Sequence, residues 1–290
     1  MEKLAFTFWD GPQLSLLNII SILSFARLNL DTTLIIYTVG KGVDINASWK
    51  SGQHSKTITR IYSLDELASE PNILIKVVES ELTEKISSVV QIADYVRIQK
   101  LYEHGGIWID TDVLFYKKIP DSLWAITYQN GFVISYLNTI TTGFLGFPKL
   151  SEGVGLALNK ANKKISENNF QNNYQSFGPL LWEEVFLEYP EAFSEVRFLS
   201  EKLVYPVLWN RLEKFFFQAE ESINLDETIG VHWYGGSNFS RSFINCNLTF
   251  LLKLKTPLTN FQKIIANLDQ QVQLLGRIKQ LEESNCLYPN

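Results

Sequence analysis

The stretch that decides the fold runs from Ala93 to Val113 and reads ADYVRIQKLYEHGGIWIDTDV. Its first part has the apolar spacing of a helix, which we expect over 87–104. Gly105-Gly106 ends that helix as a left-handed glycine cap. Ile107-Trp108-Ile109 then starts a buried strand, and Asp110 stands at its carboxyl end. In sheets of alternating strands and helices, ligands bind beyond that end.

Asp110 and Asp112 are two residues apart, so in extended backbone both side chains project to the same side. Two hard carboxylate ligands suit Mn²⁺ or Mg²⁺ better than zinc. Sites of this kind take their other ligands from water and substrate phosphates, which hints at a nucleotide or diphosphate substrate. A solvated turn after a strand is the plain alternative. Asp94 and Arg97 share one face of the preceding helix, aimed at the sheet, where an ordinary surface ion pair is the alternative.

The rest of the chain extends the pattern of alternating strands and helices. Leu4 to Phe8 predicts a first strand, 14–28 a helix and 34–39 a second strand. This β-α-β start predicts an α/β fold with a mostly parallel sheet flanked by helices. Further elements are expected as strand or short-helix material at 61–67 and 73–78, strands at 124–128 and 132–135, and helices at 153–164 and 180–187.

Apolar residues from Leu258 to Leu275 follow a spacing of three and four, which predicts a C-terminal amphipathic helix. We expect a main domain over 1–250 and a helical tail over 251–290 that packs on it. Two heptads are too few to indicate a coiled coil, so a homo-oligomer through this helix is the second interpretation.

Composition narrows the class of protein. The 290 residues are 46% hydrophobic and 20% charged, as in ordinary folded proteins, with a net charge of −5 that gives no footprint for nucleic acid. Cys246 and Cys286 lack the spacing of a zinc site. The start of the chain lacks the features of a signal peptide, and no apolar run is long enough to span a membrane. We therefore expect a cytoplasmic protein and discount the glycosylation sequons at Asn46, Asn238 and Asn247.

The run from Asp94 to Asp112 resembles the signature of the DXD-motif sugar-binding glycosyltransferases, the group of the α-1,6-mannosyltransferases, α-1,4-galactosyltransferases and capsular polysaccharide enzymes. Three further segments fit: Phe8 to Pro12 resembles the family's first strand and loop, Gly178-Pro179 its Gly-Pro element, and Gly230 to Trp233 its His-Trp element. Thr141 to Gly146 fits more loosely, since relatives often carry Asn where Thr142 stands. The resemblance spans residues 4–240.

This resemblance implies a Rossmann-like fold of the GT-A type and transfer of a hexose, with retention of configuration, from a nucleotide sugar to a glycan or glycolipid acceptor. UDP-galactose or UDP-glucose is preferred as donor over GDP-mannose. The family pattern makes Asp112 the direct metal ligand, with Asp110 shared between metal and donor and His232 approaching from the C-terminal loop. Asp94 and Arg97 would bind the donor sugar. The residues implied in catalysis are Asp94, Arg97, Asp110 and Asp112. Those implied in donor and cofactor binding are Phe8, Trp9, Asp94, Arg97, Asp110, Thr111, Asp112 and His232, and the metal ligands are Asp110, Asp112 and His232.

Two other functions remain open. Asp110 to Val113 also resembles the start of haloacid-dehalogenase-like phosphotransferases, in which the first Asp is a covalent nucleophile. That chemistry needs a second acidic pair downstream, where only Asp121, Asp226 and Asp269 occur. A protein that binds a nucleotide sugar without transferring it is the other alternative. His54 and His104 are expected to be solvated or structural.

Overall fold

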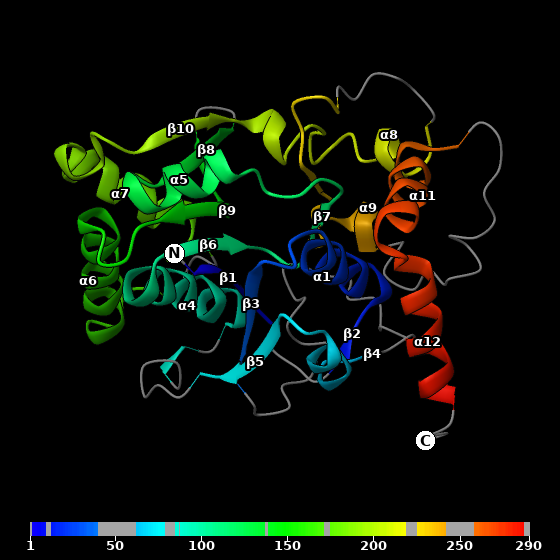
Figure 1. The fold of residues 1–290 in the computed structure, drawn as a ribbon. Helices are drawn as coiled ribbons and strands as arrows, with labels where there is room; N and C mark the ends of the chain where they lie inside the picture. The colour runs from blue at the N-terminus through cyan, green and yellow to red at the C-terminus, as the bar shows by residue number, and fades with distance from the viewer. Residues whose placement is uncertain are drawn as a thin grey trace.

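A computed structural model of the chain gives a mixed α/β fold built around one seven-stranded sheet (Figure 1). The structure describes residues 2–9, 13–39, 62–78, 85–86, 88–136, 139–170, 175–218, 225–241 and 258–286. The loop expected over 41–56, with His54 and the sequon at Asn46, lies outside these ranges. The domain boundary expected at residue 250, with Cys246 and the sequon at Asn247, falls in 242–257, which is also outside them.

The central sheet has the strand order β10-β8-β9-β6-β1-β3-β5. Every neighbouring pair is parallel except the two made by β9, which runs antiparallel to β6 and β8. The strands are β1 (Lys3–Phe8), β3 (Thr32–Thr38), β5 (Ile73–Val77), β6 (Gly106–Ile109), β8 (Phe132–Tyr136), β9 (Thr139–Phe147) and β10 (Arg197–Ser200). The mostly parallel sheet expected from the sequence is confirmed.

Each face of the sheet carries its own apolar core, because successive strand residues point to opposite sides. In β6, Ile107 and Ile109 join the core that holds α1 (Leu16–Leu28) and α5 (Asp121–Gln129), whereas Trp108 joins the other. The second core lies under α4 (Val89–His104), α6 (Glu152–Ser166) and α7 (Pro179–Glu188), which Figure 1 shows on the side of the molecule away from α1.

Short elements complete the described part of the fold. Two small ladders pair β2 (Gln13–Leu14) with β4 (Tyr62–Ser63) and β7 (Val113–Phe115) with β11 (Gly230–His232), both antiparallel. The remaining short helices are η1 (Asp65–Ser69), η2 (Pro190–Phe193), η3 (Glu201–Leu203), α8 (Glu213–Phe216) and α9 (Asn238–Arg241). The segment expected over 61–67 is therefore a two-residue strand followed by a 3₁₀ turn.

The C-terminal region forms two helices where one was expected. Figure 1 shows α11 (Asn260–Val272) and α12 (Leu274–Cys286) beside α1, and the break falls at Gln273, whose backbone is left-handed (φ 51°, ψ 43°). A capping box at Thr259 begins α11. Most apolar residues of the two helices, among them Phe261, Leu268 and Ile278, are buried within the chain, in the same core as α1. This burial favours packing on the parent chain, and dimerisation through these helices stays a prediction.

Glu70 joins α12 to the body of the molecule. Its carboxylate is 6% exposed and forms ion pairs with Arg27 (3.1 Å) and Arg277 (2.7 Å). Arg277 belongs to α12, and Arg27 also donates to the carbonyl of Val272 at the end of α11. One buried carboxylate thus holds cationic groups from two distant parts of the sequence.

The strand expected over 124–128 is wrong, because residues 121–129 form the helix α5. Its N-terminal cap is Pro120, Asp121 lies in the first turn, and Leu123, Trp124 and Thr127 are buried at helical spacing. The apolar run was too short to separate the two periods. The helices expected at 153–164 and 180–187 and the strand at 132–135 are confirmed within two residues at each end.

The glycine cap of α4 differs from the expected left-handed one. Gly105 has φ 67° but ψ 170°, which lies outside the left-handed helical region. A Cβ built on it would stand 2.3 Å from the backbone nitrogen of Lys149. Glycine is required here because the chain passes close to that backbone as it turns from α4 into β6.

Candidate metal and sugar site

The candidate site lies at the carboxyl end of β6, where the DXD segment leaves the sheet. The extended backbone expected for Asp110 and Asp112 is wrong. The N–H of Val113 donates to the carbonyl of Asp110 (3.1 Å) and closes a turn there. The N–H of Asp110 donates to the carbonyl of Gly143 in β9 (2.8 Å). The turn brings the two carboxylates together even though the alternation argument fails.

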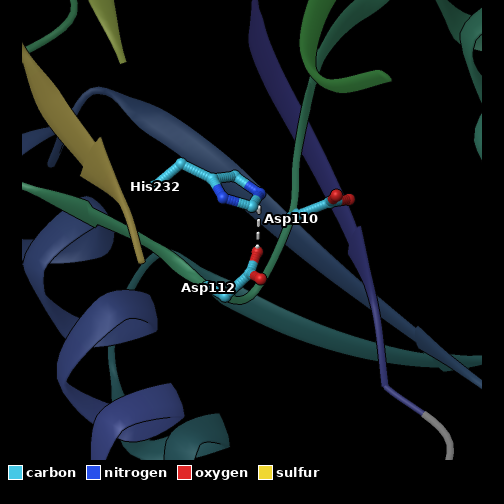
Figure 2. Close-up of side chains that lie close together, drawn as sticks. All are labelled: Asp110, Asp112 and His232. Atoms are coloured by element: carbon cyan, nitrogen blue, oxygen red, sulfur yellow. Dashed lines mark ion pairs between the residues drawn. The ribbon is translucent and has the colours of Figure 1, made fainter. Parts of the chain in front are cut away.

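His232 joins the two aspartates through the small β7–β11 ladder. In that ladder His232 stands opposite Val113, the residue after Asp112. Its Nε2 lies 3.1 Å from Oδ1 of Asp112, the contact drawn in Figure 2, while its Nδ1 accepts the backbone N–H of Tyr234 (3.2 Å). The second oxygen of Asp112 accepts the N–H of Gly235 (2.7 Å). The C-terminal segment therefore fixes both the imidazole and the carboxylate.

One potential ligand atom from each of Asp110, Asp112 and His232 lies within 4.8 Å of the others. Gly143 leaves the space between them open, because a Cβ built there would meet Oδ2 of Asp110 at 2.9 Å and Nε2 of His232 at 3.2 Å. Two carboxylates and one imidazole form a donor set that Mn²⁺ accepts readily and that Mg²⁺ fills with the help of water. These residues thus fit the divalent cation that the DXD resemblance implies.

Asp94 and Arg97 occupy the neighbouring helix α4 and are both buried. Nη1 of Arg97 lies 2.7 Å from Oδ1 of Asp94, and Nη2 lies 2.9 Å from Oδ1 of Asp110. The surface ion pair considered from the sequence is wrong, since both side chains are under 10% exposed. Arg97 instead links the acidic residue of the helix to the DXD turn.

A cavity of about 190 Å³ opens beside this network. Its lining combines aromatic and aliphatic side chains with charged ones. The cavity is lined by Phe8, Trp9, Val89, Val90, Ala93, Asp94, Arg97, Trp108, Asp110, Thr111 and Asp112. Seven of the eight residues that the sequence proposed for donor binding line this cavity, and the eighth, His232, stands beside Asp112. Residues 10–12, the rest of the expected first loop, lie outside the described ranges.

Burial and charge shift several ionisations in the site. Burial raises the pKa of Asp94 to about 6 even though Arg97 opposes the rise. Burial also raises the pKa of Asp112, but the charge and hydrogen bond of His232 outweigh it, and the pKa of Asp112 lies below its usual value. In His232 burial lowers the pKa and Asp112 raises it more, so the net change is upward. Asp112 is therefore held as a carboxylate, and that carboxylate favours a proton on the Nε2 of His232 that faces it.

Three supporting residues were missed by the sequence reasoning. Tyr205 is 4% exposed, and its hydroxyl is 2.8 Å from a Cβ built on Gly143. Asn18 in α1 donates to the carbonyl and the hydroxyl of Thr111, both at 3.4 Å. Tyr205 and Asn18 are about 90 residues from the DXD motif, and no spacing marks them. Gly143 lay inside the loosely fitting segment Thr141 to Gly146, which was the one available signal.

Trp233 and His104, which the sequence analysis also considered, lie outside the cluster of potential ligands. Trp233 is 2% exposed and donates from its indole to Ser21 (2.9 Å), so it packs beneath the site. His104 is partly exposed at the end of α4.

Within the described ranges, the only cluster of three or more potential metal ligands contains none of the later aspartates that a phosphotransferase would need. In those same ranges no helix has the length and apolar character that crossing a membrane requires.

Fold and site together define an α/β protein in which two carboxylates and one imidazole gather beside a cavity of about 190 Å³. Residues 27–130 match the family model "Glycosyltransferase sugar-binding region containing DXD motif". This match confirms, for residues 27–130, the resemblance to the DXD-motif glycosyltransferases.

Known proteins show related segments. The chain is 27% identical over 157 residues to lactosylceramide 4-alpha-galactosyltransferase of Mus musculus. The match covers 49% of this chain and 40% of that protein. Among solved structures it is similar to the bifunctional glycosyltransferase WbbM (TM-score 0.48, 11% identity, 95% of this chain and 51% of that chain). It is also similar to the glycosyltransferase GlyE of Streptococcus pneumoniae TIGR4 (TM-score 0.47, 12% identity, 80% of this chain and 54% of that chain).

Proposed function

We propose that this protein is a metal-dependent, retaining glycosyltransferase that moves a hexose from a nucleotide sugar to a glycan or glycolipid acceptor. The observation that carries the proposal is the cluster of Asp110, Asp112 and His232 beside a cavity whose lining includes Asp94 and Arg97. UDP-galactose or UDP-glucose is the preferred donor, with GDP-mannose as the other candidate. The similarity to the mouse lactosylceramide 4-alpha-galactosyltransferase supports a galactosyl donor.

The cation, Mn²⁺ or Mg²⁺, would be held by Asp110, Asp112 and His232. When bound, it would act as a Lewis acid that stabilises negative charge on the leaving diphosphate. Asp112 enters this role as a carboxylate, because His232 and the N–H of Gly235 lower its pKa. Asp110 presents one oxygen toward the space beside Gly143, since its other oxygen is bound to Arg97.

Asp94 and Arg97 would bind the hydroxyls of the donor sugar. Nε of Arg97 is buried and has no hydrogen-bond acceptor among the described residues, which leaves a donor for a ligand oxygen. The guanidinium would also supply positive charge near the leaving diphosphate, where negative charge develops as the glycosyl bond breaks. Phe8 and Trp9 form the apolar wall of the cleft and would flank the nucleobase, with Thr111 contributing at the DXD turn.

Substitution of one cation ligand tests the proposal. Asp112→Asn removes the charge and keeps the size, and we expect loss of Mn²⁺-dependent UDP binding in calorimetry and loss of donor hydrolysis. Asp65→Asn is the matched control, because Asp65 is an exposed aspartate at the start of η1. Unchanged UDP and Mn²⁺ binding in a folded Asp112→Asn protein would contradict the cation assignment.

The test also separates the other functions. Release of p-nitrophenol from p-nitrophenyl phosphate that depends on Asp110 would indicate a phosphotransferase. Metal-dependent donor binding with neither donor hydrolysis nor transfer to any acceptor would indicate a binding protein. The cytoplasmic location and the division into residues 1–250 and 251–290 stay predictions.

A further inference from the structure

Trp108 makes a contact that the donor-binding roles above do not use. It is the third residue of β6 and is 1% exposed, and its ring lines the cleft. Asp110 follows two residues later, just beyond the end of the strand. Its indole N–H donates to Oδ1 of Asp110 at 2.7 Å.

Arg97 completes this arrangement. Nη2 of Arg97 donates to the same Oδ1 at 2.9 Å, and the guanidinium carbon lies 5.0 Å from the centre of the Trp108 ring. Oδ1 therefore receives two donors, one of them charged. Oδ2 is the oxygen that lies beside the open space at Gly143 and close to His232.

Arginine has a competing way to bind Asp110. A guanidinium can hold both oxygens of a carboxylate in parallel hydrogen bonds, and this paired geometry is the stronger one. In that geometry Oδ2 would be occupied by Arg97 and would no longer be free for a cation. To reach that geometry the carboxylate of Asp110 would have to turn toward Arg97. The indole N–H of Trp108 opposes this rotation, because it binds Oδ1 of the same carboxylate.

We propose that Trp108 is a positioning residue for the cation site: its indole N–H limits Arg97 to one oxygen of Asp110 and so keeps the other oxygen available as a ligand. The inference rests on the cation site of the proposed function. It adds that the sugar-binding arginine and the metal ligand are separated by a neutral hydrogen-bond donor. Groups that orient a metal ligand typically change metal affinity by about 10–100-fold when removed.

The test replaces the indole and keeps an aromatic ring. For Trp108→Phe we expect Mn²⁺ affinity, measured by calorimetry without nucleotide, to fall about tenfold or more. Trp124→Phe makes the same atomic change at a matched site. Trp124 is 2% exposed, and its indole N–H has no hydrogen-bond acceptor in the described part of the chain. Its Mn²⁺ affinity should equal that of the wild type.

The outcomes separate this inference from the proposed function. Wild-type affinity in a folded Trp108→Phe protein, with melting temperature close to that of Trp124→Phe, overturns the positioning role alone. A wild-type protein that binds no Mn²⁺, with or without UDP, overturns the cation site and this inference with it.

A second measurement needs no Trp108 variant, in case Trp108→Phe does not fold. In protein with ¹⁵N-labelled tryptophan, we expect one indole N–H resonance that moves on addition of Mg²⁺ and is also displaced by Asp110→Asn. That resonance reports an indole bonded to Asp110. If no indole resonance responds to both changes, the proposed role is wrong.

Discussion

Gly143→Ala adds one methyl group at the centre of the proposed cation site. Gly143 lies in β9, and its carbonyl already accepts the N–H of Asp110 (2.8 Å), so its backbone cannot move away without loss of that bond. The new Cβ would stand 2.8 Å from the Tyr205 hydroxyl, 2.9 Å from Oδ2 of Asp110 and 3.2 Å from Nε2 of His232. The methyl group therefore enters the space between the ligands.

The size of the effect follows from these distances. Oδ2 of Asp110 must retreat by about half an ångström to reach the ordinary contact distance of 3.4 Å. Trp108 and Arg97 hold the other oxygen of the same carboxylate, so the retreat disturbs both bonds. Metal–ligand distances tolerate only about 0.2 Å, and we expect Mn²⁺ affinity to fall at least about tenfold. Overpacking should lower the free energy of unfolding by about 1–3 kcal/mol.

Calorimetric titration of Mn²⁺ into both proteins measures the first effect, and urea unfolding measures the second. Gly276→Ala is the control, because a Cβ at Gly276 in α12 meets nothing within 4 Å. That variant should bind Mn²⁺ normally and gain about 0.8–1 kcal/mol of helix stability. A folded Gly143→Ala protein whose Mn²⁺ affinity stays within about twofold of wild type would refute the placement of the cation.

Two further substitutions test the electrostatics. Burial raises the pKa of Asp94 from 3.8 to about 6, so its contribution to stability is complete below pH 4 and is lost as the pH rises through 6. We compare the free energy of unfolding of wild type and Asp94→Asn by urea unfolding at several pH values. The difference, wild type minus variant, should fall by up to about 3 kcal/mol between pH 4 and pH 7. A difference that does not change with pH would contradict the raised pKa of Asp94. Glu70→Gln leaves Arg27 and Arg277 without their shared carboxylate, and because both guanidinium groups reach water we expect a loss near the low end of the 3–5 kcal/mol known for broken buried pairs. Relative to wild type, Glu70→Gln should speed hydrogen exchange more in α12 than in α4. If α12 exchanges equally fast in Glu70→Gln and wild type, Glu70 does not hold α12 in place.

Local periodicity was enough to predict the β-α-β start and most helices of the fold. α1 and β3 are buried on nearly all sides and appear in the sequence as largely apolar runs, whereas α6 buries a single stripe at helical spacing. It failed for 121–129, where a short apolar run fits either period and the choice was made by Pro120, Asp121 and packing under the sheet. The break at Gln273 carries no glycine and could not be read from spacing.

The candidate site shows a different limit. Asp94, Arg97, Asp110 and Asp112 lie within one short stretch, so their proximity follows from one helix, one turn and one strand. His232 came from the family resemblance. Tyr205 is brought in only by the tertiary fold, because its segment and that of His232 run side by side: the N–H of His232 donates to the carbonyl of Val204 (2.7 Å). Such pairings depend on long-range contacts that no local pattern encodes.

The ladder between β7 and β11 ties the site to the order in which the chain is made. Residues 94–112 can form their helix, turn and strand early, but the imidazole arrives more than a hundred residues later on β11. On the ribosome, a nascent chain would hold the two aspartates without their histidine for much of its synthesis. Full affinity for a divalent ion would therefore appear only once the final third of the polypeptide has emerged and docked.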